Sequence, residues 1–153
     1  MSPERTCFIA GNWKMYKTIK EAEQYVRALL PKVASADGVE IGICVPFLAL
    51  APTVDSTRGS RVEVFAQTMH QAQEGAFTGE VSPAMLTEIG VHGVVLGHSE
   101  RRQLFGETDG ALALKVPAAP AGPITTAPLT PTLRPACEGP AGSHWRAVSA
   151  MLN

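Results

Sequence analysis

The feature that most constrains this fold is a repeat of short apolar runs, each followed by a segment of helical character, over about the first 116 residues. The runs have the length and composition of buried strands, and they cover residues 6–10, 40–45, 62–66 and 93–97. Four strand-then-helix units in succession imply an α/β fold with a parallel sheet and right-handed crossovers. Such a sheet either closes into a βα barrel or forms a doubly wound sheet, and the pattern alone does not choose between them.

The clearest helix start is Thr18, because Glu21 follows three residues later in a capping-box arrangement and apolar residues then recur at helical spacing. We expect a helix from about 18 to 30, with continuation past Pro31 left open. Other helices are expected at 47–56, from 82 or 83 through about 88, in the charged segment after His98, and at 111–116. Pro117 is expected to interrupt the last of them.

Polar side chains stand where the first and fourth strands should end. Asn12 and Lys14 follow the first strand, and His98 follows the fourth, at the strand ends where α/β proteins place their chemistry. A single histidine at such a position is more often structural, so the position alone assigns no function. The other histidines, His70, His92 and His144, follow no partner pattern and are expected to be surface or structural residues.

Composition excludes several classes of protein. With 13 basic and 14 acidic residues, the net charge of -1 provides no field that would attract nucleic acid or an anionic membrane. The start of the chain is charged without a following apolar stretch, and the two long uncharged runs, 41–54 and 116–133, are too short or too rich in proline to span a bilayer. We therefore expect a cytoplasmic protein without a secretory signal.

The cysteines give no sign of a disulfide framework or a metal site. They are odd in number and lie at wide spacings that match no metal-binding motif, at Cys7, Cys44 and Cys137. We interpret them as reduced thiols, with Cys44 acting as a small hydrophobic residue inside its strand.

Three motifs, in this order, resemble the triosephosphate isomerase family. They are GNWKM at 11–15, GAFTGE at 75–80 and LGHSERR at 96–102, and the resemblance covers residues 6 to about 116. It implies the N-terminal half of a (β/α)8 barrel, with about four βα units. It also implies the interconversion of dihydroxyacetone phosphate and glyceraldehyde 3-phosphate through an enediol, without metal or organic cofactor.

The resemblance also implies roles for individual residues. In this reaction a carboxylate base removes a proton next to a carbonyl while an electrophile polarises the carbonyl oxygen. By resemblance His98 is the electrophile, which in this family is known to act as an uncharged imidazole at a helix N-terminus. Lys14 is the cation facing the substrate, and Asn12 helps to orient it. By resemblance, three neighbouring residues support these groups without contacting the substrate. They are Ser99, Glu100, which lies near Lys14, and Arg101, which forms a structural ion pair.

The resemblance also implies that the loop at 67–81 contacts another subunit. It is long, polar and rich in glycine, and loops of this kind without regular structure usually have a task. By resemblance, the residues around Thr78 insert into a neighbouring subunit of a homodimer, an assembly that is doubtful for a chain this short. The alternative hypothesis is a non-catalytic interaction isoform that associates with full-length subunits through this loop.

The resemblance stops after the fourth unit. The family's catalytic Glu, in a Tyr-Glu-Pro-Val-Trp context, and its Gly-rich phosphate loops match no segment of this sequence. Residues 117–140 instead contain seven prolines, without helical or strand periodicity. We therefore predict a barrel part at 1–116, a divergent and disordered Pro/Ala-rich tail at 117–153, and a truncated isoform that is inactive alone and marginally stable.

Overall fold

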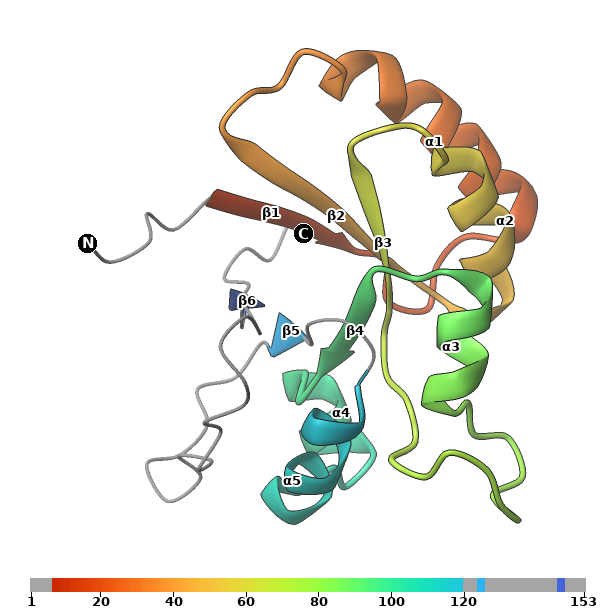
Figure 1. Ribbon diagram of the computed structural model, residues 1–153, viewed down its shortest axis with the longest axis vertical. Coiled ribbons are helices and arrows are strands. Elements are labelled where there is room, and N and C mark those ends of the chain that lie inside the picture. The colour runs from red at the N-terminus through yellow and green to blue at the C-terminus, as the bar shows by residue number, and fades with distance from the viewer. Residues whose placement is uncertain (1–6, 120–123, 126–145, 148–153) are drawn as a thin grey trace.

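The computed structural model describes residues 7–119, 124–125 and 146–147. Its core is a parallel sheet whose strands lie side by side in chain order (Figure 1). The strands are β1 (Cys7–Asn12), β2 (Val39–Val45), β3 (Val62–Ala66), β4 (Gly93–Leu96), β5 (Ile124–Thr125) and β6 (Arg146–Ala147). The sheet is curled, so the architecture is part of a (β/α)8 barrel rather than a doubly wound sheet.

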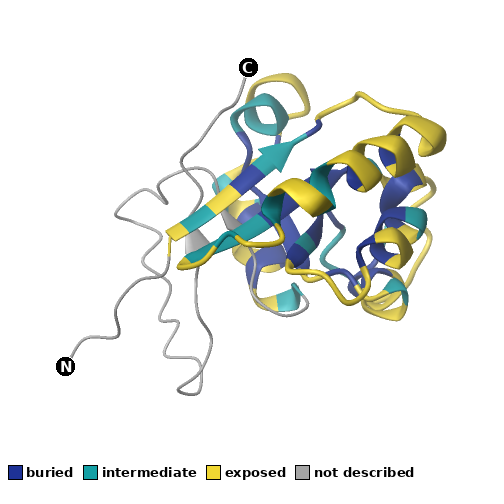
Figure 2. Cartoon of the chain, turned by 90° about the horizontal axis from the view of Figure 1, so that it is seen from above, coloured by how far each residue is buried: buried dark blue, intermediate teal, exposed yellow. Residues whose placement is uncertain are grey.

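A helix follows each of the first four strands, as the sequence pattern predicts, and a second helix follows β4. They are α1 (Ile19–Val33), α2 (Phe47–Thr57), α3 (Pro83–Ile89), α4 (Ser99–Leu104) and α5 (Asp109–Ala118). Helices α1, α2 and α3 line the convex side of the sheet (Figure 1). Their sheet-facing sides are buried and their outer sides are exposed (Figure 2). The four predicted strand-then-helix units are therefore present.

The period of two along each strand divides the buried side chains between the two faces of the sheet. On β3, Val62, Val64 and Ala66 pack in the large cluster under the helices. Phe65 belongs to a smaller cluster on the opposite face, where its ring meets that of Phe8 edge-on, with centroids 5.6 Å apart. Cys44 lies in this second cluster, and burial raises its pKa to about 12, so it remains a protonated thiol, as predicted.

Two helices continue past a proline. Helix α1 begins with the predicted capping box at Thr18 and continues past Pro31. The expectation that Pro117 interrupts the last helix is wrong, because α5 reaches Ala118. Proline removes a hydrogen bond to the carbonyl four residues earlier. That residue is exposed in both helices, Arg27 in α1 and Ala113 in α5, so water can bind the carbonyl instead.

The tail contributes two short strands that its sequence pattern did not predict. In the pairing of β5 with β4, Val95 lies opposite Ile124 and Leu96 opposite Thr125, and β6 then pairs with β5. The expectation that 117–153 contains no strand is wrong at these positions. An edge strand offers unpaired backbone groups to any extended segment, so pairing needs no strand-like side-chain pattern. The predicted disorder of 120–123, 126–145 and 148–153 lies outside the described residues.

Candidate active site

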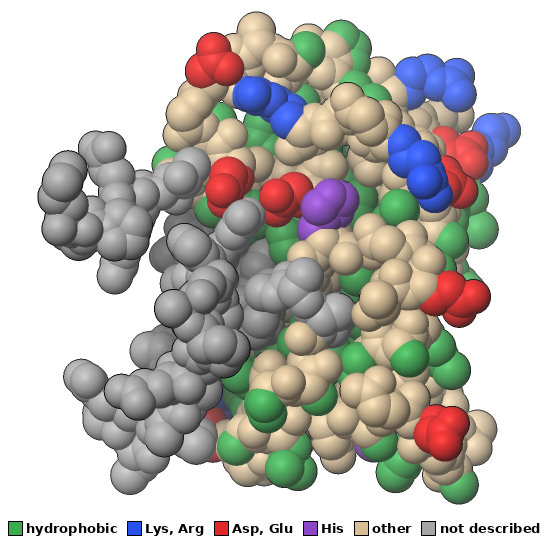
Figure 3. Space-filling view, viewed as in Figure 1, with side chains coloured by type: hydrophobic (Ala, Val, Ile, Leu, Met, Phe, Trp, Pro, Cys, Tyr) green, Lys and Arg blue, Asp and Glu red, His purple; other side chains and the backbone are tan. Residues whose placement is uncertain are grey.

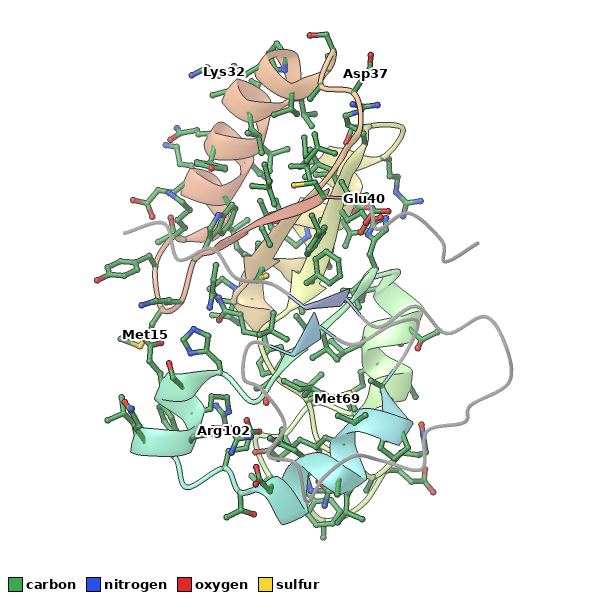
Figure 4. All side chains as sticks on the ribbon, turned by 90° about the vertical axis from the view of Figure 1, so that its left-hand side faces the viewer. Met15, Lys32, Asp37, Glu40, Met69 and Arg102 are labelled. Atoms are coloured by element: carbon green, nitrogen blue, oxygen red, sulfur yellow. The ribbon has the colours of Figure 1, made fainter. Side chains whose placement is uncertain are left out.

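The predicted site residues lie at one end of the sheet. Asn12 ends β1 and Lys14 follows it, Gln67 directly follows β3, and His98 follows β4 by two residues. The strands are parallel, so these positions share the carboxyl-terminal edge. In Figure 4, Met15 and Arg102 lie at this end, and Lys32 and Asp37 lie at the other.

Lys14 and His98 approach the same carboxylate. The Lys14 ammonium lies 2.7 Å from Oε1 of Glu100, and the Nδ1 atom of His98 lies 3.7 Å from Oε2 of the same residue. The side chains of Lys14 and Glu100 are each about two-fifths exposed, whereas that of His98 is 10% exposed. His98 and Lys14 are 84 positions apart in the sequence. Both lie close to Glu100, which is in the first turn of α4.

The hydrogen bond at Nδ1 determines which form of the His98 imidazole is present. His98 is the N-cap of α4, and its Nδ1 accepts a hydrogen bond from the backbone N–H of Glu100, with an N···N distance of 3.2 Å. An acceptor nitrogen carries no proton, so the proton of the ring is on Nε2. The ring is therefore an uncharged imidazole whose Nε2–H can donate a hydrogen bond to a ligand.

Gln67 orients Asn12 and the backbone of Lys14. Its Nε2 group donates toward Asn12 Oδ1 at 3.1 Å, Lys14 O at 2.9 Å and Cys44 O at 3.1 Å. The same Oδ1 atom accepts from the Lys14 backbone N–H at 3.0 Å. Because Oδ1 is engaged by two donors, the amide nitrogen is the end of Asn12 that can donate to a ligand. The sequence motifs assign Gln67 no role, although its place directly after the third strand is a signal for one.

A buried ion pair supports the backbone just before His98. Glu107 accepts a hydrogen bond from the Gly97 N–H at 3.1 Å through Oε2, and its Oε1 lies 2.7 Å from the Lys115 ammonium. The two side chains are 3% and 10% exposed. Arg101 Nε lies 3.9 Å from Glu107 Oε1, and its role as a structural ion-pair residue stays a prediction. Glu107 and Lys115 were not predicted from the sequence, because they lie outside the strand ends.

The structure thus places Asn12, Lys14 and His98 at the strand ends where their positions in the sequence predict them. The family model of triosephosphate isomerase matches residues 7–127. The chain belongs to the triosephosphate isomerase family.

Individual relatives show how much of the family's length is present. Triosephosphate isomerase of Carboxydothermus hydrogenoformans is 55% identical over 115 residues, which cover 75% of this chain and 46% of that protein. The crystal structure of triosephosphate isomerase from Bartonella henselae superposes with a TM-score of 0.75 at 34% identity, covering 80% of this chain and 52% of the other. The chain therefore spans about half the length of the triosephosphate isomerases it matches.

The predicted subunit-contact loop projects from this isomerase half-barrel. Its neck is closed by a hydrogen bond from the His70 N–H to Val81 O at 2.8 Å, and the ring of His70 lies on that of Phe77, 4.0 Å between centroids. Thr78 at the tip is exposed. Contact of Thr78 with a second subunit stays a prediction.

Among the described residues, no cluster of three or more His, Cys, Asp or Glu side chains could hold a metal ion. None of the helices in the described ranges has the length and apolar character needed to cross a lipid bilayer. Acidic and basic side chains are dispersed over the face seen in Figure 3.

The Lys14–Glu100 ion pair leads to a prediction for the titration of Glu100. The hydrogen bond and charge of Lys14 lower the pKa of Glu100 below the usual range of a glutamate. The pair therefore contributes to stability above the ordinary glutamate pKa, and the contribution is lost as the pH falls through the lowered value. An NMR titration should give Glu100 a low midpoint, and Lys14→Met should move it upward. An unchanged midpoint in Lys14→Met would contradict the pairing.

Proposed function

We propose that this chain carries the electrophilic half of a triosephosphate isomerase site and binds triose phosphates there. The observation that supports this most strongly is the convergence of His98 and Lys14 on the Glu100 carboxylate, with the His98 proton on Nε2. A neutral N–H donor beside a cation suits a carbonyl oxygen that gains negative charge as the enediol forms. The family's place in glycolysis and gluconeogenesis, and a cytoplasmic location, are part of the proposal.

The proposed roles follow from the chemistry of each group. The His98 Nε2–H donates to the carbonyl oxygen, and the Lys14 ammonium attracts the phosphate and the developing oxyanion. Asn12 donates from its amide nitrogen and helps to orient the substrate. Glu100 and Gln67 act on these groups rather than on the substrate, because their own polar atoms contact Lys14 and Asn12.

Binding of a phosphorylated mimic of the enediolate tests this proposal apart from catalysis. We expect 2-phosphoglycolate to bind the 153-residue chain, and Lys14→Met to weaken binding by about 10- to 100-fold, because a hydrogen bond between charged groups is lost. Isothermal titration calorimetry measures the dissociation constant. Lys32→Met is the matched control, since Lys32 lies at the opposite end of the sheet (Figure 4). Equal affinity for the chain and for Lys14→Met would refute the proposal.

A further inference from the structure

The loop that carries Lys14 contains an unusual backbone. Lys14 has a φ of 54° and Lys17 has a φ of 75°, and in the described part of the chain these two are the residues other than glycine with positive φ. Residues other than glycine rarely adopt this left-handed backbone conformation, and they remain in it only where the surrounding structure holds them. The loop from Trp13 to Lys17 must therefore be held on both sides of Lys14.

The side of the loop that joins β1 is held by hydrogen bonds. The Trp13 N–H donates to Cys44 O at 2.9 Å, and the Lys14 backbone is bound through its N–H to Asn12 and through its carbonyl to Gln67. A turn follows, in which the Tyr16 N–H donates to Trp13 O at 3.2 Å. These contacts hold the loop where it leaves the sheet.

The side that joins α1 is held by a cation on two aromatic rings. The Lys17 ammonium lies 4.8 Å from the ring centroid of Tyr25, on α1, and 5.5 Å from that of Trp13. The two rings meet edge-on, with centroids 5.2 Å apart and planes at 77°. Trp13 is buried in the main core cluster, whereas Tyr25 is exposed on α1. Lys17 therefore links the loop to the core and to the first helix immediately before the Thr18 cap.

We propose that Lys17 is a positioning residue for Lys14, and that its contact with Trp13 and Tyr25 holds the loop so that the Lys14 ammonium lies at the substrate end of the sheet. This inference rests on the proposed function, because the position of Lys14 matters only if Lys14 binds the ligand. A glycine would adopt a φ of 75° more easily, so the backbone alone gives no reason for a lysine here. The side-chain cation supplies that reason.

Three substitutions separate the cation from the rest of the side chain. Lys17→Met keeps the apolar stem and removes the charge, whereas Lys17→Arg keeps a cation that can lie on the rings. Lys20→Met is the control, because Lys20 is exposed and contacts no aromatic ring among the residues that the structure describes. We expect Lys17→Met to weaken 2-phosphoglycolate binding by about two- to fivefold. Lys17→Arg should bind like the unmodified chain, and Lys20→Met should do the same.

The titration of Glu100 gives a second readout that a purely structural role of Lys17 would not move. If Lys17→Met displaces the Lys14 ammonium, the NMR midpoint of Glu100 should rise while the melting temperature stays close to that of Lys20→Met. Unchanged affinity and an unchanged Glu100 midpoint in Lys17→Met would overturn the inference, as would equal losses in Lys17→Met and Lys17→Arg. If Lys14→Met also binds normally, the proposed function itself fails, so the two failures are distinguishable.

Discussion

A chain of these 153 residues should convert triose phosphates about 10²- to 10⁴-fold more slowly than its relative from Carboxydothermus hydrogenoformans. The reaction needs a base to remove a proton from carbon as well as an electrophile to polarise the carbonyl. In the proposed function His98 and Lys14 provide the electrophilic side, and the predicted absence of the family's catalytic Glu leaves no base to face them. The expected rate follows from that prediction.

Neither carboxylate beside His98 is suited to replace that base. Glu100 is engaged with the Lys14 ammonium, which lowers the pKa of Glu100 and makes it a weaker base. Glu107 is 3% exposed, and its oxygens are occupied by Lys115 and by the Gly97 N–H. A carboxylate that must take a proton from substrate needs a free oxygen in contact with it.

A coupled assay of dihydroxyacetone phosphate formation measures the rate. The chain, His98→Ala and Lys14→Ala should be compared at equal concentration, with the relative as the reference enzyme. Any residual rate should fall further in both variants if it arises at the proposed site. Turnover within tenfold of the relative would show that another group serves as the base, and the prediction would be wrong.

Replacing Lys115 by methionine should lower the free energy of unfolding by about 3–5 kcal/mol. The Glu107 carboxylate would remain 3% exposed without its cationic partner at 2.7 Å. Removing one member of a buried pair costs this much because the other charge stays desolvated. The Lys115 ammonium also lies 3.5 Å from the hydroxyl of Thr68, so the contact between α5 and the segment after β3 would be lost as well.

Urea unfolding followed by circular dichroism measures the change. Lys32→Met, at an exposed position of α1, should stay within about 0.5 kcal/mol of the unmodified chain. The double variant Lys115→Met with Glu107→Gln should recover part of the loss, because the uncompensated charge is then removed. A cost for Lys115→Met equal to that of Lys32→Met would mean that the pair does not stabilise the fold.

The regular elements were predictable because their signals are local. The apolar runs gave β3 with its observed bounds and the other long strands within two residues, and the Thr18 capping box gave the start of α1. The short strands of the tail were not predictable. Pairing at the edge of β4 depends on backbone groups that any extended segment can satisfy, so the sequence of Ile124–Thr125 carries no distinctive pattern.

The positions of His98, Lys14 and Asn12 at one edge were also predictable, since the ends of parallel strands meet there. Their chemical states were not. The proton on His98 Nε2 follows from a hydrogen bond to Nδ1 at the start of α4, and the orientation of the Asn12 amide follows from Gln67, 55 residues away.

By itself, the sequence determined the order of strands and helices and the residue types brought to one end of the sheet. Periodicity and capping act over a few residues, and the repeated strand-then-helix order makes the strands parallel, so that their ends share one edge. Tertiary structure alone decided which of those side chains touch. The Glu107–Lys115 pair, the Gln67 hydrogen bonds and the contact of Lys17 with Tyr25 form only when separate elements pack, because hydrogen bonds and ion pairs depend on distances that residue order does not specify.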